Sequence, residues 1–267
     1  MGESIAILGS GVMGETLLSG LLRAGREATD VVITERRPER AAELSARYGV
    51  VVTSNSAAVA DADTVLLVVK PQDIAALLEE IRDHLPHDVL VVCIAAGITT
   101  AFVEQRLPRG IAVVRVMPNT PALVDEGMAA ISPGSHCDAG HLDRARALLS
   151  ATGKVVQVPE SHQDAVTAIS GSGPAYIFYV VEAMIEAGVL LGLSRVTSTE
   201  LVVQTLYGAA TMLRETGEHP TVLREQVSSP AGTTIAALRQ LDDHKVRAAF
   251  LTAMESARDT RELSAGS

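Results

Sequence analysis

The sequence feature that most constrains the fold is a short apolar run that leads directly into a glycine-rich turn. Residues 4–8 have the length and composition of a buried parallel strand, and leucines follow the turn at helical spacing. The order strand, G-x-G-x-x-G, helix is that of a dinucleotide-binding unit. Its three glycines allow a tight turn, close approach of a pyrophosphate and helix–strand packing. An ordinary glycine-rich turn would not need this order, so we predict dinucleotide contacts from Gly9, Ser10, Gly11, Val12, Met13 and Gly14.

The second strand-like run, residues 31–35, ends in an acidic residue. In dinucleotide-binding units the residue at this position contacts the adenosine ribose. Glu35 alone favours NAD(H). Arg36 and Arg37 follow at once, and a guanidinium can pair bidentately with the 2′-phosphate of NADP(H). The alternative is that both arginines are solvated residues before Pro38. We expect Glu35, Arg36 and Arg37 to contact the cofactor, with NADP(H) preferred and NAD(H) as the other option.

Strand-like and helix-like runs alternate along the chain up to about Val158. Beyond the first two strands, we predict strands over residues 50–53, 64–69, 90–94, 112–117, 128–132 and 155–158, and helices over residues 38–48, 74–85, 100–106 and 143–151. This alternation is typical of an α/β fold with a Rossmann-type, doubly wound parallel sheet. The remaining sequence has helical patterns and no convincing strand. We therefore predict a dinucleotide-binding domain over residues 1–158 and an all-helical domain over residues 159–267.

Ligands of such sheets bind at the carboxyl ends of the strands, where this chain places small or polar residues. Lys70 is suited to the ribose or the phosphates. Ala95 and Ala96 are small enough for a nicotinamide to approach the backbone, and Asn119 offers an amide. Alternatively, Lys70 is a solvated residue at a strand end, and the prolines that follow these strands, Pro71, Pro118 and Pro121, only stiffen turns.

The helical half contains a segment, residues 169–193, that is apolar nearly all round. Glu182 and Glu186 lie near its middle, and a charged group at the centre of a bilayer costs at least ~2.5 kcal/mol, so we do not expect a membrane span. A helix that is apolar on all faces must be surrounded by protein. A domain of this size can hardly surround it alone, so we expect a second subunit to do so.

Composition limits the classes of partner and the compartment. The net charge of −10 argues against nucleic acid or an anionic membrane surface as partner. Two cysteines, one of them in an apolar strand, exclude a disulfide framework, and no export signal is visible. We expect a cytoplasmic protein. His136, Cys137 and His141 share a polar loop but lack a convincing zinc spacing, so no metal is predicted.

A second anion site is predicted near the C-terminus. Residues 228–234 combine serines, threonines, a proline and a glycine, and they open onto the helical pattern of residues 235–241. A helix N-terminus presents unpaired N–H groups and the positive end of the helix dipole, which suit a carboxylate or phosphate. Because the nucleotide loop lies at the other end of the chain, this site is available for a substrate.

These motifs together resemble the pyrroline-5-carboxylate reductase family over essentially the whole chain. The matching segments are residues 9–14, 69–72, 95–98, 117–121, 164–176 and 227–234, the last being the most specific. The resemblance implies a Rossmann domain followed by a helical dimerisation and substrate domain, in dimers that often assemble into decamers. It implies hydride transfer from NAD(P)H to the cyclic imine 1-pyrroline-5-carboxylate, which gives L-proline in the last step of proline biosynthesis.

The resemblance also implies roles for individual residues. It implies cofactor contacts from Asn55, Val69, Lys70, Pro71, Ile94, Ala95 and Ala96, and substrate contacts from Glu160, Thr233 and Thr234. From their positions in the chain we also expect Gly97 to contact the cofactor, and Asn119 and Gly232 to contact the substrate. Ala231 stands where many members of the family have glycine. Hydride transfer is helped by a protonated imine nitrogen, and water can supply that proton. We hypothesise that the Thr234 hydroxyl reaches the ring nitrogen; the alternative is that Thr234 only caps a helix.

Two other functions fit parts of the sequence. A β-hydroxyacid dehydrogenase has a catalytic lysine on the first helix after the domain boundary, but this chain has no lysine between Lys154 and Lys245. A non-catalytic dinucleotide sensor would keep the glycine-rich turn but would not need the hydroxyl-rich segment at residues 228–234.

Overall fold

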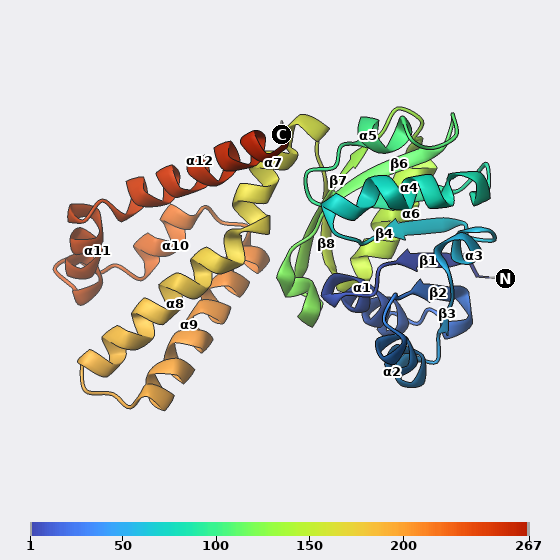
Figure 1. The fold of residues 1–267 in the computed structure, drawn as a ribbon. Coiled ribbons are helices and arrows are strands. Elements are labelled where there is room, and N and C mark those ends of the chain that lie inside the picture. Colours follow the sequence, from blue (N-terminus) through green and yellow to red (C-terminus); the bar gives the residue numbers. More distant parts are fainter. Residues whose placement is uncertain (1, 266–267) are drawn as a thin grey trace. The chain divides into compact units, whose positions relative to one another are not determined.

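The computed structural model describes residues 2–265, which form two compact units (Figure 1). One unit contains the chain up to Ser172 together with its last residues, from Arg258 onward. The other unit is Gly173–Ala257. The predicted domain boundary lies after residue 158, whereas the compact units divide after Ser172; the boundary stays a prediction.

The first unit is built on one eight-stranded sheet with strand order β3-β2-β1-β4-β5-β6-β7-β8. Buried apolar runs form most of these strands, as expected for a sheet covered on both faces. The strands are β1 (Ile5–Leu8), β2 (Val31–Thr34), β3 (Val51–Val52), β4 (Thr64–Leu67), β5 (Leu90–Cys93), β6 (Ala112–Met117), β7 (Gly127–Pro133) and β8 (Gly153–Gln157). The chain leaves β1 toward β2 and returns to β4 on the other side of β1. The doubly wound prediction is confirmed.

The sheet is parallel, as predicted, except at one pair of strands. β7 runs antiparallel to β6, with Val116 opposite Ile131, whereas every other neighbouring pair is parallel. A parallel connection needs a crossover of about a dozen residues or more, usually through a helix. Only the stretch between Met117 and Gly127, with a short 3₁₀ turn at Thr120–Val124, joins β6 to β7. The chain therefore turns back beside β6.

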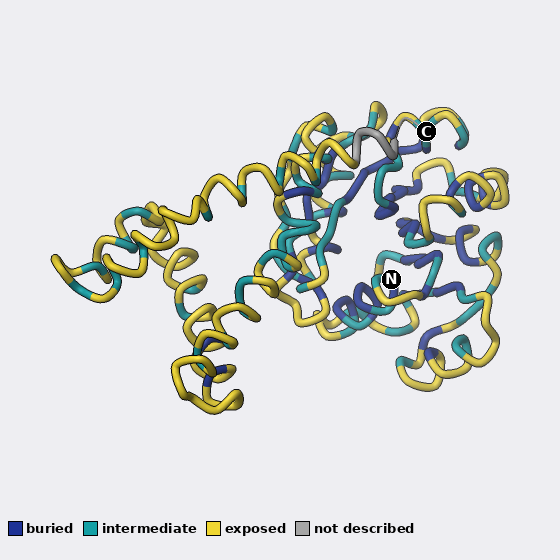
Figure 2. The backbone as a smooth tube through the Cα atoms, turned by 60° about the vertical axis from the view of Figure 1, so that its left-hand side comes forward, coloured by how far each residue is buried: buried dark blue, intermediate teal, exposed yellow. Residues whose placement is uncertain are grey.

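Two layers of helices cover the two faces of the sheet. Alternate residues of β1 face opposite sides: Ile5 and Ile7 belong to one apolar core, Ala6 and Leu8 to the other. The first core is closed by α1 (Val12–Arg23), α2 (Pro38–Tyr48) and α6 (Ala139–Leu149). The second is closed by α3 (Asn55–Val59), α4 (Ile74–Ile81) and α5 (Thr100–Glu104). Figure 2 shows the strands of this unit as mostly buried backbone.

The chain leaves the sheet through α7 (Gln163–Val166) and a π-helical turn at Thr167–Gly171. The second unit then begins with α8 (Gly173–Leu190) and α9 (Arg195–Thr216), which contact each other as an antiparallel pair. α10 (Pro220–Gln226), α11 (Thr233–Asp243) and α12 (Val246–Ala265) follow. No strand occurs after β8 in the described chain, so the predicted helical half is confirmed.

The helices of the second unit expose much of their apolar surface. Figure 2 shows them largely exposed, and only Ser198 and Val202 of α9 are buried. Phe178, Tyr179 and Leu190 of α8 are 65%, 75% and 88% exposed. Within residues 2–265 one helical stretch, Glu160–Leu190, is long and apolar enough to cross a membrane by length and composition. None of its most apolar 18-residue window is buried within the chain.

Candidate active site

The glycine-rich turn has the geometry that its sequence predicts. Gly9 has a φ of +103°, and a Cβ there would meet the Val68 carbonyl oxygen at 2.9 Å. Gly11 precedes α1 and faces open space, whereas a Cβ on Gly14 would collide with the Gly9 carbonyl oxygen. Ser10 is buried, and its hydroxyl donates to the Thr34 carbonyl at 2.9 Å. The α1 N-terminus has no side-chain cap, so its first-turn N–H groups can bind a phosphate.

A hollow of about 240 Å³ lies at the carboxyl ends of the central strands. Its lining combines residues at or just after the ends of β4, β5 and β6 with one residue of α1: Met13, Val68, Val69, Ile94, Ala95, Ala96, Met117 and Pro118. The structure thus brings together five residues predicted to contact the cofactor. Lys70 and Pro71 are exposed and do not line the hollow. Val68, Met117 and Pro118 were missed as lining residues, although Met117 ends a predicted strand and Pro118 directly follows it.

The segment predicted to read the ribose contains a tight ion pair. Arg37 donates from its backbone N and its Nε to Glu35 Oε1, at 3.0 and 3.1 Å, and from Nη2 to Glu35 Oε2 at 3.3 Å. These hydrogen bonds lower the pKa of the Glu35 carboxyl below its usual range. Arg37 is therefore already paired with Glu35, and the contacts of both residues with the cofactor stay predictions. The Arg36 side chain is exposed and has no hydrogen bond or ion pair within residues 2–265.

Two predicted amide ligands already bind other parts of the chain. Asn55 Nδ2 donates to Glu80 Oε2 at 3.0 Å. Asn119 accepts from the Met128 backbone N at 2.8 Å and donates to the Ser170 carbonyl at 3.1 Å, which holds the π-helical turn against the end of β6. Both residues thus have structural partners, and their ligand contacts stay predictions.

Glu160 lies in a network of polar contacts at the end of the sheet. Its Oε1 accepts from the Thr100 backbone N at 2.8 Å and from Arg115 Nη1 at 3.3 Å, and its Oε2 accepts from the Thr100 hydroxyl at 2.6 Å. The Arg115 side chain is 9% exposed and also lies 3.7 Å from Asp164 Oδ1. Sequence reasoning missed Thr100 and Arg115, because their partner lies 60 and 45 residues away along the chain.

The predicted helix N-terminus is present in the second unit. α11 begins at Thr233, its N-cap residue is Gly232, and no side chain caps it. The hydroxyl of Thr234 has no hydrogen-bond partner within residues 2–265, so Thr234 does not cap this helix through its side chain. Ala231 has a φ of +58°, a left-handed conformation that glycine adopts without steric cost. The first-turn N–H groups of α11 are available to an anion.

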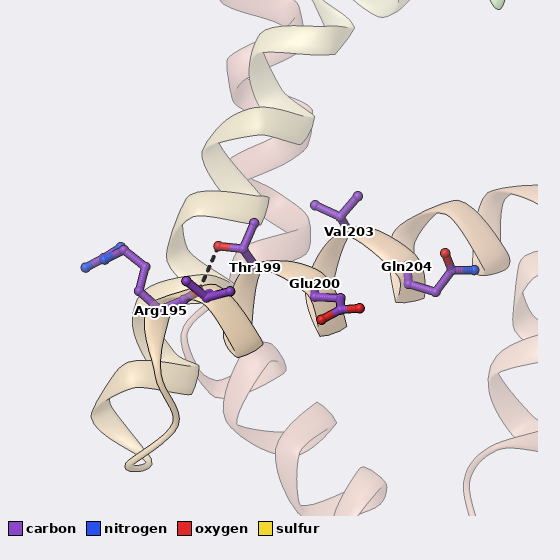
Figure 3. A pocket seen from close by; sticks show the side chains of 6 residues that line it. Arg195, Thr199, Glu200, Val203 and Gln204 are labelled. Atoms are coloured by element: carbon purple, nitrogen blue, oxygen red, sulfur yellow. Dashed lines mark hydrogen bonds between the residues drawn. The ribbon is translucent and has the colours of Figure 1, made fainter.

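A larger, open hollow of about 590 Å³ lies on α9 alone (Figure 3). Its lining is Arg195, Val196, Thr199, Glu200, Val203 and Gln204, and the Thr199 hydroxyl donates to the Arg195 carbonyl. It includes none of the predicted site residues. A hollow formed by one face of one helix is a feature of an uncovered surface, so we place the chemistry elsewhere.

No group of three or more metal-ligating side chains is found in the described part of the chain. Cys137 donates to the Val113 carbonyl, and His141 forms a capping box with Asp138 at the start of α6. The Cys93 thiol is buried, and burial raises its pKa to about 11.

Comparison with known proteins identifies the family. The family described as pyrroline-5-carboxylate reductase dimerisation matches residues 160–263, and the family described as NADP oxidoreductase coenzyme F420-dependent matches residues 4–97. The pyrroline-5-carboxylate reductase of Corynebacterium melassecola is 48% identical over 263 residues, which cover 97% of each chain. The chain belongs to the pyrroline-5-carboxylate reductase family. The reductase of Mycobacterium tuberculosis is 43% identical over an alignment of 281 positions, gaps included, that covers 97% of this chain and 95% of that protein.

Solved structures of pyrroline-5-carboxylate reductases have the same fold. The reductase of Coxiella burnetii has a TM-score of 0.93 at 34% identity, with 97% of both chains covered. The reductase of Plasmodium falciparum, solved with NADP bound, has a TM-score of 0.87 at 26% identity, with 99% of this chain and 98% of that chain covered. The predicted fold class and family are confirmed.

Proposed function

We infer that this chain is a pyrroline-5-carboxylate reductase, which reduces 1-pyrroline-5-carboxylate to L-proline with a hydride from NAD(P)H. The observation that carries this inference is the intact segment 228–234, which opens onto the uncapped N-terminus of α11. A dinucleotide sensor would not need this second anion site. No lysine lies between Lys154 and Lys245, so the chain lacks the catalytic lysine that a β-hydroxyacid dehydrogenase has on the first helix after the domain boundary.

The residues of the chain supply binding and orientation. The N-terminus of α1 and the hollow beside Ala95 and Ala96 suit the pyrophosphate and the nicotinamide, and the residues there are small or apolar. The nicotinamide, when bound, supplies the hydride that goes to the imine carbon, and water supplies the proton for nitrogen. Backbone N–H groups at Thr233 and Thr234 hold the substrate carboxylate. The Thr234 hydroxyl, which the fold leaves without a partner, donates to the ring nitrogen as it becomes an amine.

NADPH is the preferred cofactor in this proposal. Arg36 has no competing partner, so its guanidinium is available for the 2′-phosphate. Glu35 is neutralised by Arg37, which reduces the repulsion that this carboxylate would exert on a phosphate. NADH remains the second cofactor.

The working form is a homodimer in the cytoplasm, with the decamer as a further assembly. The exposed apolar residues of α8 and α9 support a second subunit as the cover of this surface. Two glutamates within the apolar helix argue against a lipid cover. The net charge of −10 argues against nucleic acid.

The test is loss of NADPH absorbance with the purified protein. We expect oxidation of NADPH only when 1-pyrroline-5-carboxylate is present, and no reduction of NAD or NADP by 3-hydroxyisobutyrate. Tight NADPH binding without turnover of the pyrroline would instead support the sensor function.

A further inference from the structure

We propose that Asn119 is a positioning residue, which holds the π-helical turn at Thr167–Gly171 against Met117 and so fixes Met117 in the wall of the hollow at the strand ends. This inference rests on the proposed function, since it assigns the hollow to the nicotinamide end of the cofactor. Met117 ends β6 and lines the hollow together with Pro118. The groups that fix Met117 therefore also shape the space that receives the nicotinamide.

The π-helical turn interrupts the helical stretch Glu160–Leu190 and leaves a carbonyl without its usual donor. The Ser172 backbone N donates to the Thr167 carbonyl at 2.8 Å, a bond that spans five residues instead of four. In an α-helix the Ser170 carbonyl would accept from residue 174, but that residue is a proline and has no N–H. The Ser170 carbonyl thus needs a donor from elsewhere.

Asn119 supplies this donor from outside the helix. Its Nδ2 donates to the Ser170 carbonyl oxygen at 3.1 Å, and its Oδ1 accepts from the Met128 backbone N at 2.8 Å. Asn119 follows the last residue of β6 by two positions, and Met128 is the second residue of β7. One side-chain amide therefore joins the neighbouring ends of two strands to the π-helical turn.

The turn approaches Met117 at Gly171, where there is no room for a side chain. A Cβ on Gly171 would lie 2.6 Å from Met117 Cε, which is closer than van der Waals contact allows. Cε is the free end of a flexible side chain, so an added methyl group would displace it and leave the backbone in place. Met117 is half-buried and lines the hollow, so the hollow is the free space that the displaced end can enter.

The first experiment adds that methyl group. Gly171→Ala should raise the dissociation constant of NADPH, measured without the pyrroline, about tenfold, because overpacking a filled contact has a cost of that order. Adenosine 2′,5′-bisphosphate, which has no nicotinamide, should bind as it does to the unmodified protein. Shortening the other partner, in the double variant Gly171→Ala with Met117→Leu, should restore the affinity for NADPH. General damage to the fold would not be rescued in this way.

The second experiment tests the amide. Asn119→Asp keeps an acceptor for the Met128 N–H but replaces the donor to the Ser170 carbonyl by an oxygen, so it releases the turn from β6. We expect NADPH to bind about tenfold more weakly and adenosine 2′,5′-bisphosphate to bind as before. Ser170→Ala is the matched control, because it removes the hydroxyl that donates to the Val166 carbonyl and keeps the backbone carbonyl that Asn119 binds. Its NADPH affinity should not change.

Three results would overturn the proposal. Unchanged NADPH affinity in Gly171→Ala would separate the turn from the hollow, and this variant decides the matter if Asn119→Asp does not fold. Equal losses of affinity for NADPH and for the bisphosphate would mean that the whole nucleotide site is disturbed. A raised KM for the pyrroline with unchanged NADPH affinity in Asn119→Asp would make Asn119 a substrate ligand.

The proposed reaction and the role of Asn119 can fail separately. NADPH affinity is measured without the pyrroline, so a protein that binds NADPH but does not reduce the pyrroline would refute the proposed reaction. The same measurements would still test whether Asn119 and Gly171 shape the hollow.

Discussion

At the scale of single residues, the Thr234 side chain gives the sharpest test of mechanism. Gly232 is the N-cap of α11, so Thr234→Ala should leave the melting temperature nearly unchanged. If the hydroxyl stabilises the developing amine, its loss removes ~1.5–3 kcal/mol of transition-state stabilisation and lowers kcat/KM roughly ten- to a hundredfold. Thr234→Ser, which keeps the hydroxyl, should stay near the original kcat/KM. A fully active Thr234→Ala enzyme would remove Thr234 from the mechanism.

Arg36 and Arg37 should influence cofactor choice by different routes. The Arg36 side chain has no partner in the described structure, so Arg36→Ala should lower kcat/KM about tenfold with NADPH and leave the NADH value unchanged. Arg37→Ala removes the side-chain hydrogen bonds that lower the pKa of Glu35 and leaves its carboxylate without a cationic partner. That carboxylate can then accept from the ribose hydroxyl of NADH, so the NADH value should rise. Steady-state kinetics with both cofactors measure these kcat/KM values. An unchanged ratio of kcat/KM for NADPH to that for NADH in Arg36→Ala would contradict the role of Arg36.

At the scale of elements, local sequence signals predicted most boundaries of helices and strands. The features that were missed depend on pairing between residues distant in sequence. The helix predicted at residues 38–48 and the strand at 112–117 have those bounds, because proline starts the first and a buried apolar run forms the second. The helix predicted from residue 143 begins at Ala139, since its capping box uses a histidine in place of the usual glutamate. The antiparallel β7 and the Glu160 network depend on partners distant in sequence, which no local pattern specifies.

The turn that precedes α11 carries backbone strain at Ala231. Its φ of +58° is left-handed, a conformation that costs a non-glycine residue roughly 1–2 kcal/mol. Glycine relieves this cost but gains ~0.4–1 kcal/mol of unfolded-state entropy, so Ala231→Gly should stabilise the protein by about 0.5–1 kcal/mol. Thermal unfolding should show a midpoint about 1–3 °C higher. Ala231→Val, with a β-branched side chain in the same conformation, should lower it; a lower midpoint for the glycine variant would show that strain does not dominate.

At the scale of the whole molecule, the two units differ in how their apolar residues are covered. The sheet unit buries two apolar cores within the chain. The helical unit has no comparable core among its described residues, and α8 carries exposed phenylalanine, tyrosine and leucine side chains. Covering one such side chain stabilises a protein by about 1.5–3 kcal/mol, so several together favour association. The same residues match a family defined by dimerisation.

We therefore expect the protein to be an obligate dimer or a higher multiple, and to be recovered without detergent. Light scattering at micromolar concentration should give at least twice the 28.0 kDa of one chain. Phe178→Glu and Leu190→Glu each place a charge on the exposed apolar face of α8 and should shift the protein toward monomer or aggregate. Val124→Glu is the matched control, because Val124 is 71% exposed but belongs to the sheet unit, and its mass should not change. A stable monomer of the unmodified protein, or recovery only with membranes, would mean that the exposed face of α8 is not covered by a second copy of the chain.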